Sequence, residues 1–183
     1  TIYWKYKLSP ETLNISAGTN VTEIEVMELS LKRQGISQNV LELIDREIPY
    51  HLVFILKYKG LGQIWISYKE DSKSREDKFK VDSYYHTDWL KHDELSLKIE
   101  GLDLDKVYEN FMLQVAGDKL QTPIASGELS LKEAVEQAQE TEKLEANIKG
   151  LETKLRNEKQ FNRQVQLMGE LRKVKEMLKN YQK

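Results

Sequence analysis

The C-terminal part of the chain is a long proline-free segment whose apolar residues recur at steps of three and four. It runs from Glu128 to the end at Lys183. Such steps place apolar side chains along one side of an α-helix. A helix with one apolar side needs a second helix to cover it, either from the same chain or from a partner. The segment therefore predicts a helical extension that pairs with itself or with another protein.

The apolar residues of this segment form two stripes that are out of register. The first stripe consists of Leu144, Ile148, Leu151 and Leu155. The second stripe consists of Phe161, Val165, Met168, Leu171, Val174, Leu178 and Tyr181. If the first heptad continued, Glu158 and Asn162 would occupy core positions, so the register is lost between Arg156 and Gln160. Either the chain reverses there into a helical hairpin, or one long helix changes its contact face.

The charge distribution favours the hairpin. Residues 128–152 contain three Lys or Arg and seven Asp or Glu, whereas residues 153–183 contain nine Lys or Arg and three Asp or Glu. Antiparallel helices would place the acidic half beside the basic half. The absence of Gly and Pro between Arg156 and Gln160 argues against a tight turn.

A basic helix can also bind nucleic acid by neutralising phosphates. The candidate residues for such contacts are Lys154, Arg156, Lys159, Arg163, Arg172, Lys173 and Lys175. Because Phe161 and Tyr181 both fall on the apolar stripe, base stacking is not expected. A solvated face of a coiled coil is the favoured interpretation of these basic residues.

The preceding residues alternate between strand and helix patterns. Strands are predicted at Thr22–Lys32, His51–Tyr58, Ile64–Tyr68 and Phe79–His86, and helices from Ser37 to Pro49 and from Asp103 to Gly117. The apolar residues of the first strand change face, which indicates a bulge or burial on both faces. These elements predict an α+β domain over residues 1–117, with a small mixed, mainly antiparallel sheet and flanking helices. A linker over residues 118–127 and a helical hairpin or coiled coil over residues 128–183 should follow.

Composition excludes several classes of protein. The chain has no cysteine, so it has neither disulfides nor thiolate metal sites. No apolar run approaches the ~18 residues that a membrane span requires. We therefore expect a cytoplasmic protein without a membrane segment, metal or cofactor. Because the sequence begins at Thr1 rather than at Met, we also expect it to start inside a longer gene product.

Three strand glutamates are the first candidates for catalysis. Glu23, Glu25 and Glu28 lie close together in sequence, with Lys32 beyond them. Metal-dependent nucleases of the restriction type bind Mg²⁺ through strand carboxylates and place a lysine beside the scissile phosphate. Their usual acid-x-Lys triplet is missing from the following hairpin, which has Ser67-Tyr68-Lys69 instead. Solvated carboxylates are therefore the favoured interpretation.

Asp82 and His86 are the second candidates, with His51 and His92 as possible neighbours. Histidine beside carboxylates can transfer protons near neutral pH or bind a metal. A half-buried aromatic edge formed by Tyr84, Tyr85 and Trp89 is the favoured alternative.

A further charged group, Asp45-Arg46-Glu47, falls at the end of a predicted helix. We expect it to be a solvated ion-pair face of small energetic effect.

Four segments of the chain resemble a bacterial family catalogued as domain of unknown function 4391. They are Val21–Val26, Ile44–His51, Tyr84–Trp89 and Glu158–Val165. The resemblance extends over the whole chain and implies that a helical segment precedes Thr1. It also implies a setting beside DNA methyltransferase and helicase genes in restriction or phage-defence clusters. It implies no established activity, so no catalytic residue is transferred.

These observations predict a non-catalytic interaction or accessory subunit of a bacterial DNA-processing system. Interaction would occur through a protein partner, or through self-association of the C-terminal helices, with DNA reached through the partner or through the basic residues. The contact residues would be Leu144, Ile148, Leu151, Leu155, Phe161, Val165, Leu171 and Leu178. The alternatives are a divergent metal-dependent nuclease and a nucleic-acid-binding accessory protein.

Overall fold

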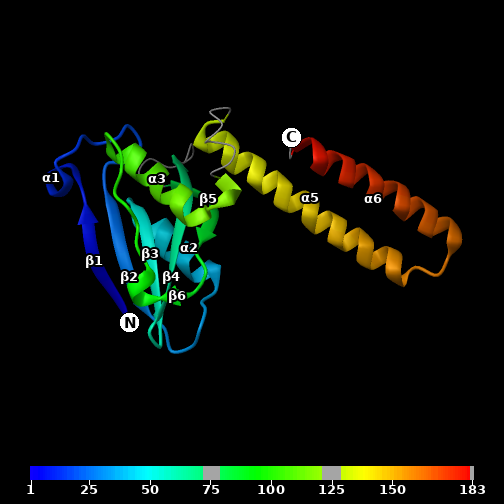
Figure 1. The fold of residues 1–183 in the computed structure, drawn as a ribbon, viewed down its shortest axis with the longest axis horizontal. Helices are drawn as coiled ribbons and strands as arrows, with labels where there is room; N and C mark the ends of the chain where they lie inside the picture. Colours follow the sequence, from blue (N-terminus) through cyan, green and yellow to red (C-terminus); the bar gives the residue numbers. More distant parts are fainter. Residues whose placement is uncertain (72–78, 121–128, 182–183) are drawn as a thin grey trace. The chain divides into compact units, whose positions relative to one another are not determined.

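The chain divides into two compact units, Thr1–Ala125 and Ser126–Lys183 (Figure 1). A computed structural model describes residues 1–71, 79–120 and 129–181. The first unit combines a mainly antiparallel sheet with helices, and the second is a helical hairpin. The predicted α+β class with a C-terminal helical extension is therefore confirmed.

The sheet of the first unit has the strand order β1-β2-β3-β4-β5, and the short strand β6 pairs with β4. The strands are β1 (Ile2–Leu8), β2 (Ile24–Ser30), β3 (His51–Tyr58), β4 (Leu61–Asp71), β5 (Phe79–His86) and β6 (Leu90–Lys91). The helices are α1 (Pro10–Leu13), α2 (Gln38–Glu47), α3 (Leu104–Ala116) and the 3₁₀ turn η1 (His92–Glu94). Strands β2 and β3 pair in parallel, because α2 crosses between them, and the other described strand pairs are antiparallel.

Helices cover the two faces of the sheet, with α2 behind it and α3 in front of it in Figure 1. Leu41 of α2 packs in one cluster with residues of β2 and β3, including Met27 and Phe54. On the opposite face, the ring of Tyr108 in α3 contacts that of His51. Strand β2 is therefore buried on both faces, which explains its change of phase. The bulge itself lies in the neighbouring strand, between Trp4 and Tyr6.

The hairpin between β3 and β4 turns at Lys59 and Gly60, which both have positive φ values, 46° and 81°. Positive φ at both central residues is the geometry of a type I′ turn, whose twist matches that of the flanking strands. This turn sets the register in which Val53 pairs with Ile66 and Phe54 with Trp65. The same register places polar side chains farther along β4 on the face of the sheet that α2 covers.

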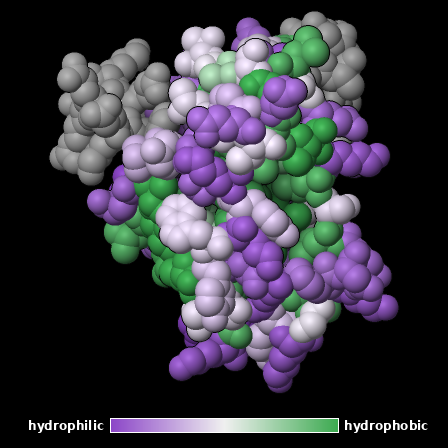
Figure 2. Space-filling view, turned by 90° about the vertical axis from the view of Figure 1, so that its left-hand side faces the viewer, coloured by the Kyte–Doolittle hydropathy of each residue, from purple (hydrophilic) through white to green (hydrophobic). Residues whose placement is uncertain are grey.

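Strand β1, which was not predicted from the sequence, forms one edge of the sheet. Ile2, Tyr3, Trp4 and Tyr6 are each more than half exposed. Figure 2 views the side on which β1 lies in Figure 1 and shows hydrophobic surface interrupted by hydrophilic side chains. The bulge and the lysines of the strand are features that commonly protect an edge from pairing with another strand.

The second unit consists of α5 (Leu131–Asn157) and α6 (Phe161–Tyr181), which pack against each other. Ser130 and Glu133 form a capping box at the start of α5. The chain reverses at residues 158–160, without glycine or proline. The Glu158 carboxylate accepts hydrogen bonds from the backbone N–H groups of Lys159 and Gln160, each at 2.9 Å. The Glu158 side chain therefore stabilises the reversal, which has no glycine or proline.

The stripe of α5 packs as predicted, but that of α6 differs from the prediction. The α6 residues turned towards α5 are Gln164, Leu167, Leu171, Val174 and Leu178, all partly buried. Phe161, Val165 and Met168 are 73%, 48% and 48% exposed. The predicted second stripe thus joined residues from two different sides of α6. The physical reason is that Leu167, not Met168, continues the heptad back from Leu171.

Part of the predicted linker can be placed. Asp118–Leu120 are described, and Leu120 is fully buried, whereas 121–127 lie outside the described residues. Among the helices that the structure describes, none is both long and apolar enough to cross a membrane.

Candidate functional site

A buried polar cluster connects the end of α2 to strands β4 and β5. The Asp45 carboxylate forms an ion pair with Lys69 Nζ at 2.6 Å, and neither side chain is exposed. The other carboxylate oxygen accepts hydrogen bonds from Ser67 Oγ at 2.6 Å and from Tyr84 Oη at 2.7 Å. Lys69 Nζ also donates to the backbone carbonyl of Tyr50 at 2.6 Å. The cluster therefore fastens the C-terminal end of α2 to the sheet.

The expectation that Asp45 lies on a solvated ion-pair face was wrong. Asp45 lies four residues after Leu41, on the apolar side of α2, and both residues are fully buried. Burial lowers the pKa of Lys69, and the adjacent Asp45 charge opposes this effect. Burial, reinforced by the charge of Asp45, raises the pKa of Tyr84. An enclosed and mutually satisfied group of this kind orders the structure but gives a substrate no direct access.

The structure separates Glu28 from the other two candidate glutamates. Glu25 and Glu28 point to opposite faces of β2, because side chains alternate along a strand. Glu28 forms ion pairs with Lys57 at 2.8 Å and with Lys5 at 3.4 Å. Burial alone would raise the pKa of Glu28, but these two lysines leave it below its usual value.

Glu23 and Glu25 do lie together, with Lys7 of β1 beside them. Lys7 Nζ is 2.5 Å from the Glu23 carboxylate. Burial, followed by the hydrogen bond and charge of Glu23, raises the pKa of Glu25 to about 7. The fold therefore favours the protonated form of Glu25. No group of three or more His, Asp or Glu in the described part of the chain could hold a metal ion.

The histidines are also kept apart. His51 is buried against Tyr108 on the α3 side, and burial lowers its pKa to about 3, so it is neutral at pH 7. His86 stacks on Trp65 with ring centroids 4.4 Å apart, on the α2 side. Its Nδ1 lies 3.1 Å from Gln63 Nε2. The Asp82 side chain, the other candidate here, lies outside the described residues.

The outer surface of α6 is a second candidate site, formed by exposed apolar and basic residues. Phe161, Val165 and Met168 form a stripe at steps of four and three, which continues through Arg172, Lys175 and Lys179 at the same spacing. This outer stripe is apolar in its first half and basic in its second half. It lies about a third of a turn around α6 from the stripe that packs on α5. Helix α6 contains no fully buried residue.

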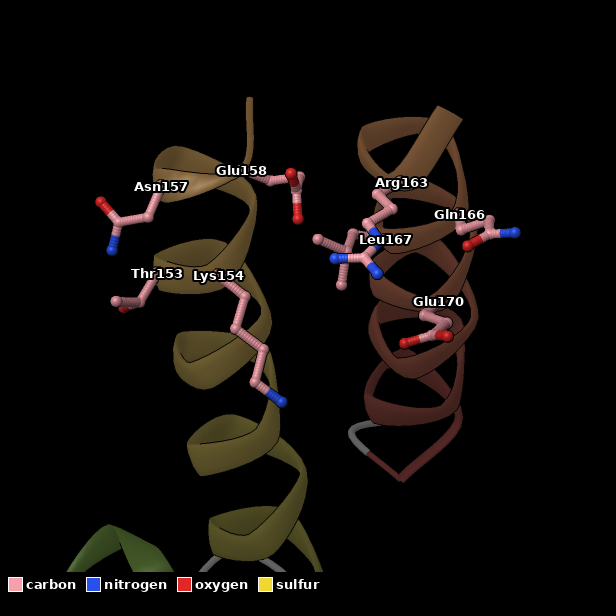
Figure 3. A pocket seen from close by; sticks show the side chains of 8 residues that line it. All are labelled: Thr153, Lys154, Asn157, Glu158, Arg163, Gln166, Leu167 and Glu170. Atoms are coloured by element: carbon pink, nitrogen blue, oxygen red, sulfur yellow. The ribbon is translucent and has the colours of Figure 1, made fainter. Parts of the chain in front are cut away.

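Two hollows lie between the helices of the hairpin. The first, of about 490 Å³, is shown in Figure 3 and is lined by Thr153, Lys154, Asn157, Glu158, Arg163, Gln166, Leu167 and Glu170. Arg163 and Leu167 of α6 and Glu158 at the end of α5 are directed into the space between the helices, whereas Asn157 points away from α6 (Figure 3). The two basic and two acidic residues of this hollow offset one another.

The second hollow has a volume of about 430 Å³ and borders the outer stripe. It is lined by Glu145, Ile148, Lys149, Glu152, Lys175, Leu178 and Lys179. Lys175 Nζ forms an ion pair with the Glu152 carboxylate at 2.7 Å. Ile148 and Leu178 give this hollow an apolar component, and basic residues outnumber acidic ones around it.

The basic candidates are distributed around the hairpin rather than gathered into one patch. Lys154 and Arg163 line the hollow of Figure 3, and Arg172 and Lys175 belong to the outer stripe. Lys173, Lys159 and Arg156 are exposed elsewhere on the hairpin. This distribution does not form a continuous track for a phosphate backbone.

Comparison with known proteins identifies the family. Residues 1–178 match the family described as Domain of unknown function (DUF4391). The chain belongs to this family. The match includes the hairpin through most of α6, so both units are part of the DUF4391 architecture. Searches of curated proteins and of solved structures gave no match.

Sequence reasoning missed both the buried cluster and the outer stripe as separate features. Two signals could have identified the cluster, namely Asp45 on the apolar side of its helix and Lys69 in phase with Trp65 on its strand. The outer stripe was hidden because Met168 precedes Leu171 by three residues. That step joins two different sides of α6 without a visible break in the pattern.

Proposed function

We propose that this DUF4391 protein is a non-catalytic interaction subunit, with the α+β unit as a scaffold and the helical hairpin as a docking arm. The observation that supports this proposal is the outer stripe of α6, in whose apolar half Phe161, Val165 and Met168 are 73%, 48% and 48% exposed. The polar groups in the α+β unit are, by contrast, largely paired with one another. The setting that we propose for this protein is a cytoplasmic DNA-processing assembly.

The size of the apolar half of the stripe limits the binding free energy that it can contribute. Complete burial of a Val, Met or Phe side chain contributes roughly 1.5–3 kcal/mol. Covering the exposed parts of Phe161, Val165 and Met168 would therefore contribute on the order of 3 kcal/mol. A micromolar complex requires about 8 kcal/mol, so a partner must contact more than these three residues.

Affinity purification from the native host tests the proposal. Three versions are compared, namely the wild type, a triple variant Phe161→Ser, Val165→Ser, Met168→Ser, and the control Met177→Ser. Met177 is 55% exposed but lies on another side of α6. We expect the triple variant to recover at least tenfold less of a specific partner and Met177→Ser to recover a normal amount. Equal recovery by all three versions, or no specific partner, would refute the docking arm.

Nuclease assays test the enzymatic alternative separately. The purified chain is incubated with DNA and RNA in the presence of Mg²⁺ or Mn²⁺. We expect no cleavage. Cleavage that is abolished by Glu25→Ala would establish an enzyme and overturn the proposed function.

A further inference from the structure

The outer stripe of α6 changes character along its length. Phe161, Val165 and Met168 occupy its first half, and Arg172, Lys175 and Lys179 occupy its second half at the same helical spacing. A stripe with this spacing matches a helix that lies alongside it, as in a helical bundle. Because a helix rises 1.5 Å per residue, the stripe is about 27 Å long from Phe161 to Lys179.

The basic half is only weakly engaged within the chain. Arg172 pairs with Glu176 on the same helix, but these side chains are 84% and 63% exposed. Lys179 forms no ion pair within the described part of the chain. Lys175 pairs with Glu152 of α5 at 2.7 Å, and these side chains are 48% and 44% exposed. Ion pairs as exposed as those of Arg172 and Lys175 are worth little, so these cations remain open to a stronger partner. The hollow lined by Ile148 and Leu178 lies beside them and can receive an apolar side chain.

We propose that the outer stripe of α6 binds an acidic amphipathic helix of another protein. This inference rests on the proposed docking function and specifies the chemistry of the partner. Apolar residues of the partner helix cover Phe161, Val165 and Met168, and its Asp or Glu residues pair with Arg172, Lys175 and Lys179. An additional apolar residue enters the hollow beside Leu178.

The observations favour this partner over nucleic acid and over a second copy of the chain. A phosphate backbone carries uniform charge, whereas the stripe is basic only in its second half and apolar in its first. In a second copy, the acidic helix is α5, but its apolar stripe already packs against α6. Helix α5 contributes no large exposed apolar residue that could meet Phe161.

Photo-cross-linking from the two ends of the stripe tests this inference in the full chain. Benzoylphenylalanine is placed at Val165, at Lys179 or at the off-stripe control position Lys173, and cross-linked peptides from the native host are sequenced. We expect Val165 and Lys179 to capture one helical segment of another protein, with its acidic residues near the Lys179 contact. The Lys173 position should not capture it. Capture of a second copy, of nucleic acid or of a segment without acidic residues would overturn the inference.

Binding of the captured segment completes the test. The segment is synthesised as a peptide, in its natural form and with its Asp and Glu changed to Asn and Gln. We expect the natural peptide to bind at least tenfold more tightly and to weaken as salt is added. Arg172→Glu with Lys179→Glu should remove this advantage, whereas the matched control Lys173→Glu should retain it. Equal binding of both peptides would refute the acidic partner but leave the docking arm intact, whereas failure to capture any partner would refute both.

Discussion

Both units of this protein expose apolar side chains, those of β1 among them, but the two units differ in the polar groups that they bury. In the α+β unit, polar groups such as Asp45 and Lys69 are buried and paired with one another. In the hairpin, apolar groups such as Phe161 and Met168 remain at the surface. A polar group inside a core must be satisfied locally, whereas an exposed apolar stripe has a favourable contact still to make. Under the proposed function, the buried polar pair orders the first unit, and the outer stripe of α6 serves recognition in the second.

The largest effect on stability is expected when one member of the buried pair Asp45–Lys69 is removed. Lys69→Met leaves the Asp45 charge uncompensated in the interior, so we expect the free energy of unfolding to fall by about 3–5 kcal/mol. Urea unfolding followed by tryptophan fluorescence measures this loss, because all three tryptophans, Trp4, Trp65 and Trp89, lie in the α+β unit.

The double variant Asp45→Asn, Lys69→Met provides the control. It removes both charges, so its loss should be smaller than the loss from Lys69→Met alone. If Lys69→Met costs less than about 1 kcal/mol, the cluster does not hold α2 to the sheet.

The next test compares the two sides of the hairpin. Leu151→Ala removes a buried side chain between the helices and should lower the stability of the hairpin by about 2 kcal/mol. Met168→Ala changes only the outer stripe and should alter stability by less than about 0.5 kcal/mol. Far-UV circular dichroism during urea unfolding measures both effects, because α5 and α6 contain most of the helical residues. Similar losses from both variants would mean that the outer stripe already packs within the chain.

The sequence predicted most of the first unit because its signals are local. Ser37, Pro49, Asp103 and Gly117 mark helix ends, and the apolar run from His51 predicts a buried strand. Strand β1 could not be predicted in this way, because its exposed aromatic residues are in place only through pairing with β2. The parallel pairing of β2 with β3 is also a long-range contact that no local pattern specifies.

In the hairpin, too, local sequence patterns could not specify a contact between distant residues. The loss of register near Arg156–Gln160 located the reversal correctly. Periodicity alone could not tell which of two neighbouring stripes on α6 faces α5, since both have steps of three and four. The partner helix decides that choice, and the choice determines which residues remain available for recognition.

A final test concerns Glu25. This partly buried acid lies in the first unit but is not neutralised by a direct ion pair, so it is an exception to the paired polar groups of that unit. Its pKa of about 7 in the folded chain lies above the ordinary value of 4.5. The fold therefore favours its protonated form, and the resulting stability is fully present below about pH 4.5 and is lost as the pH rises through 7. Glu25→Gln, which keeps a neutral donor beside Glu23, should remove this loss.

We therefore expect Glu25→Gln to be more stable than the wild type at pH 8 and nearly equal to it at pH 5. Solvent screening at this partly exposed site limits the difference to under about 1 kcal/mol. Glu28→Gln is the matched contrast, because Lys57 and Lys5 lower the pKa of Glu28. Its loss of stability should appear above pH 4.5 and vanish as the pH falls through the folded pKa of Glu28. Urea unfolding at pH 5, 6, 7 and 8 measures both curves, and a Glu25→Gln difference that stays constant with pH would show that the fold does not raise the pKa of Glu25.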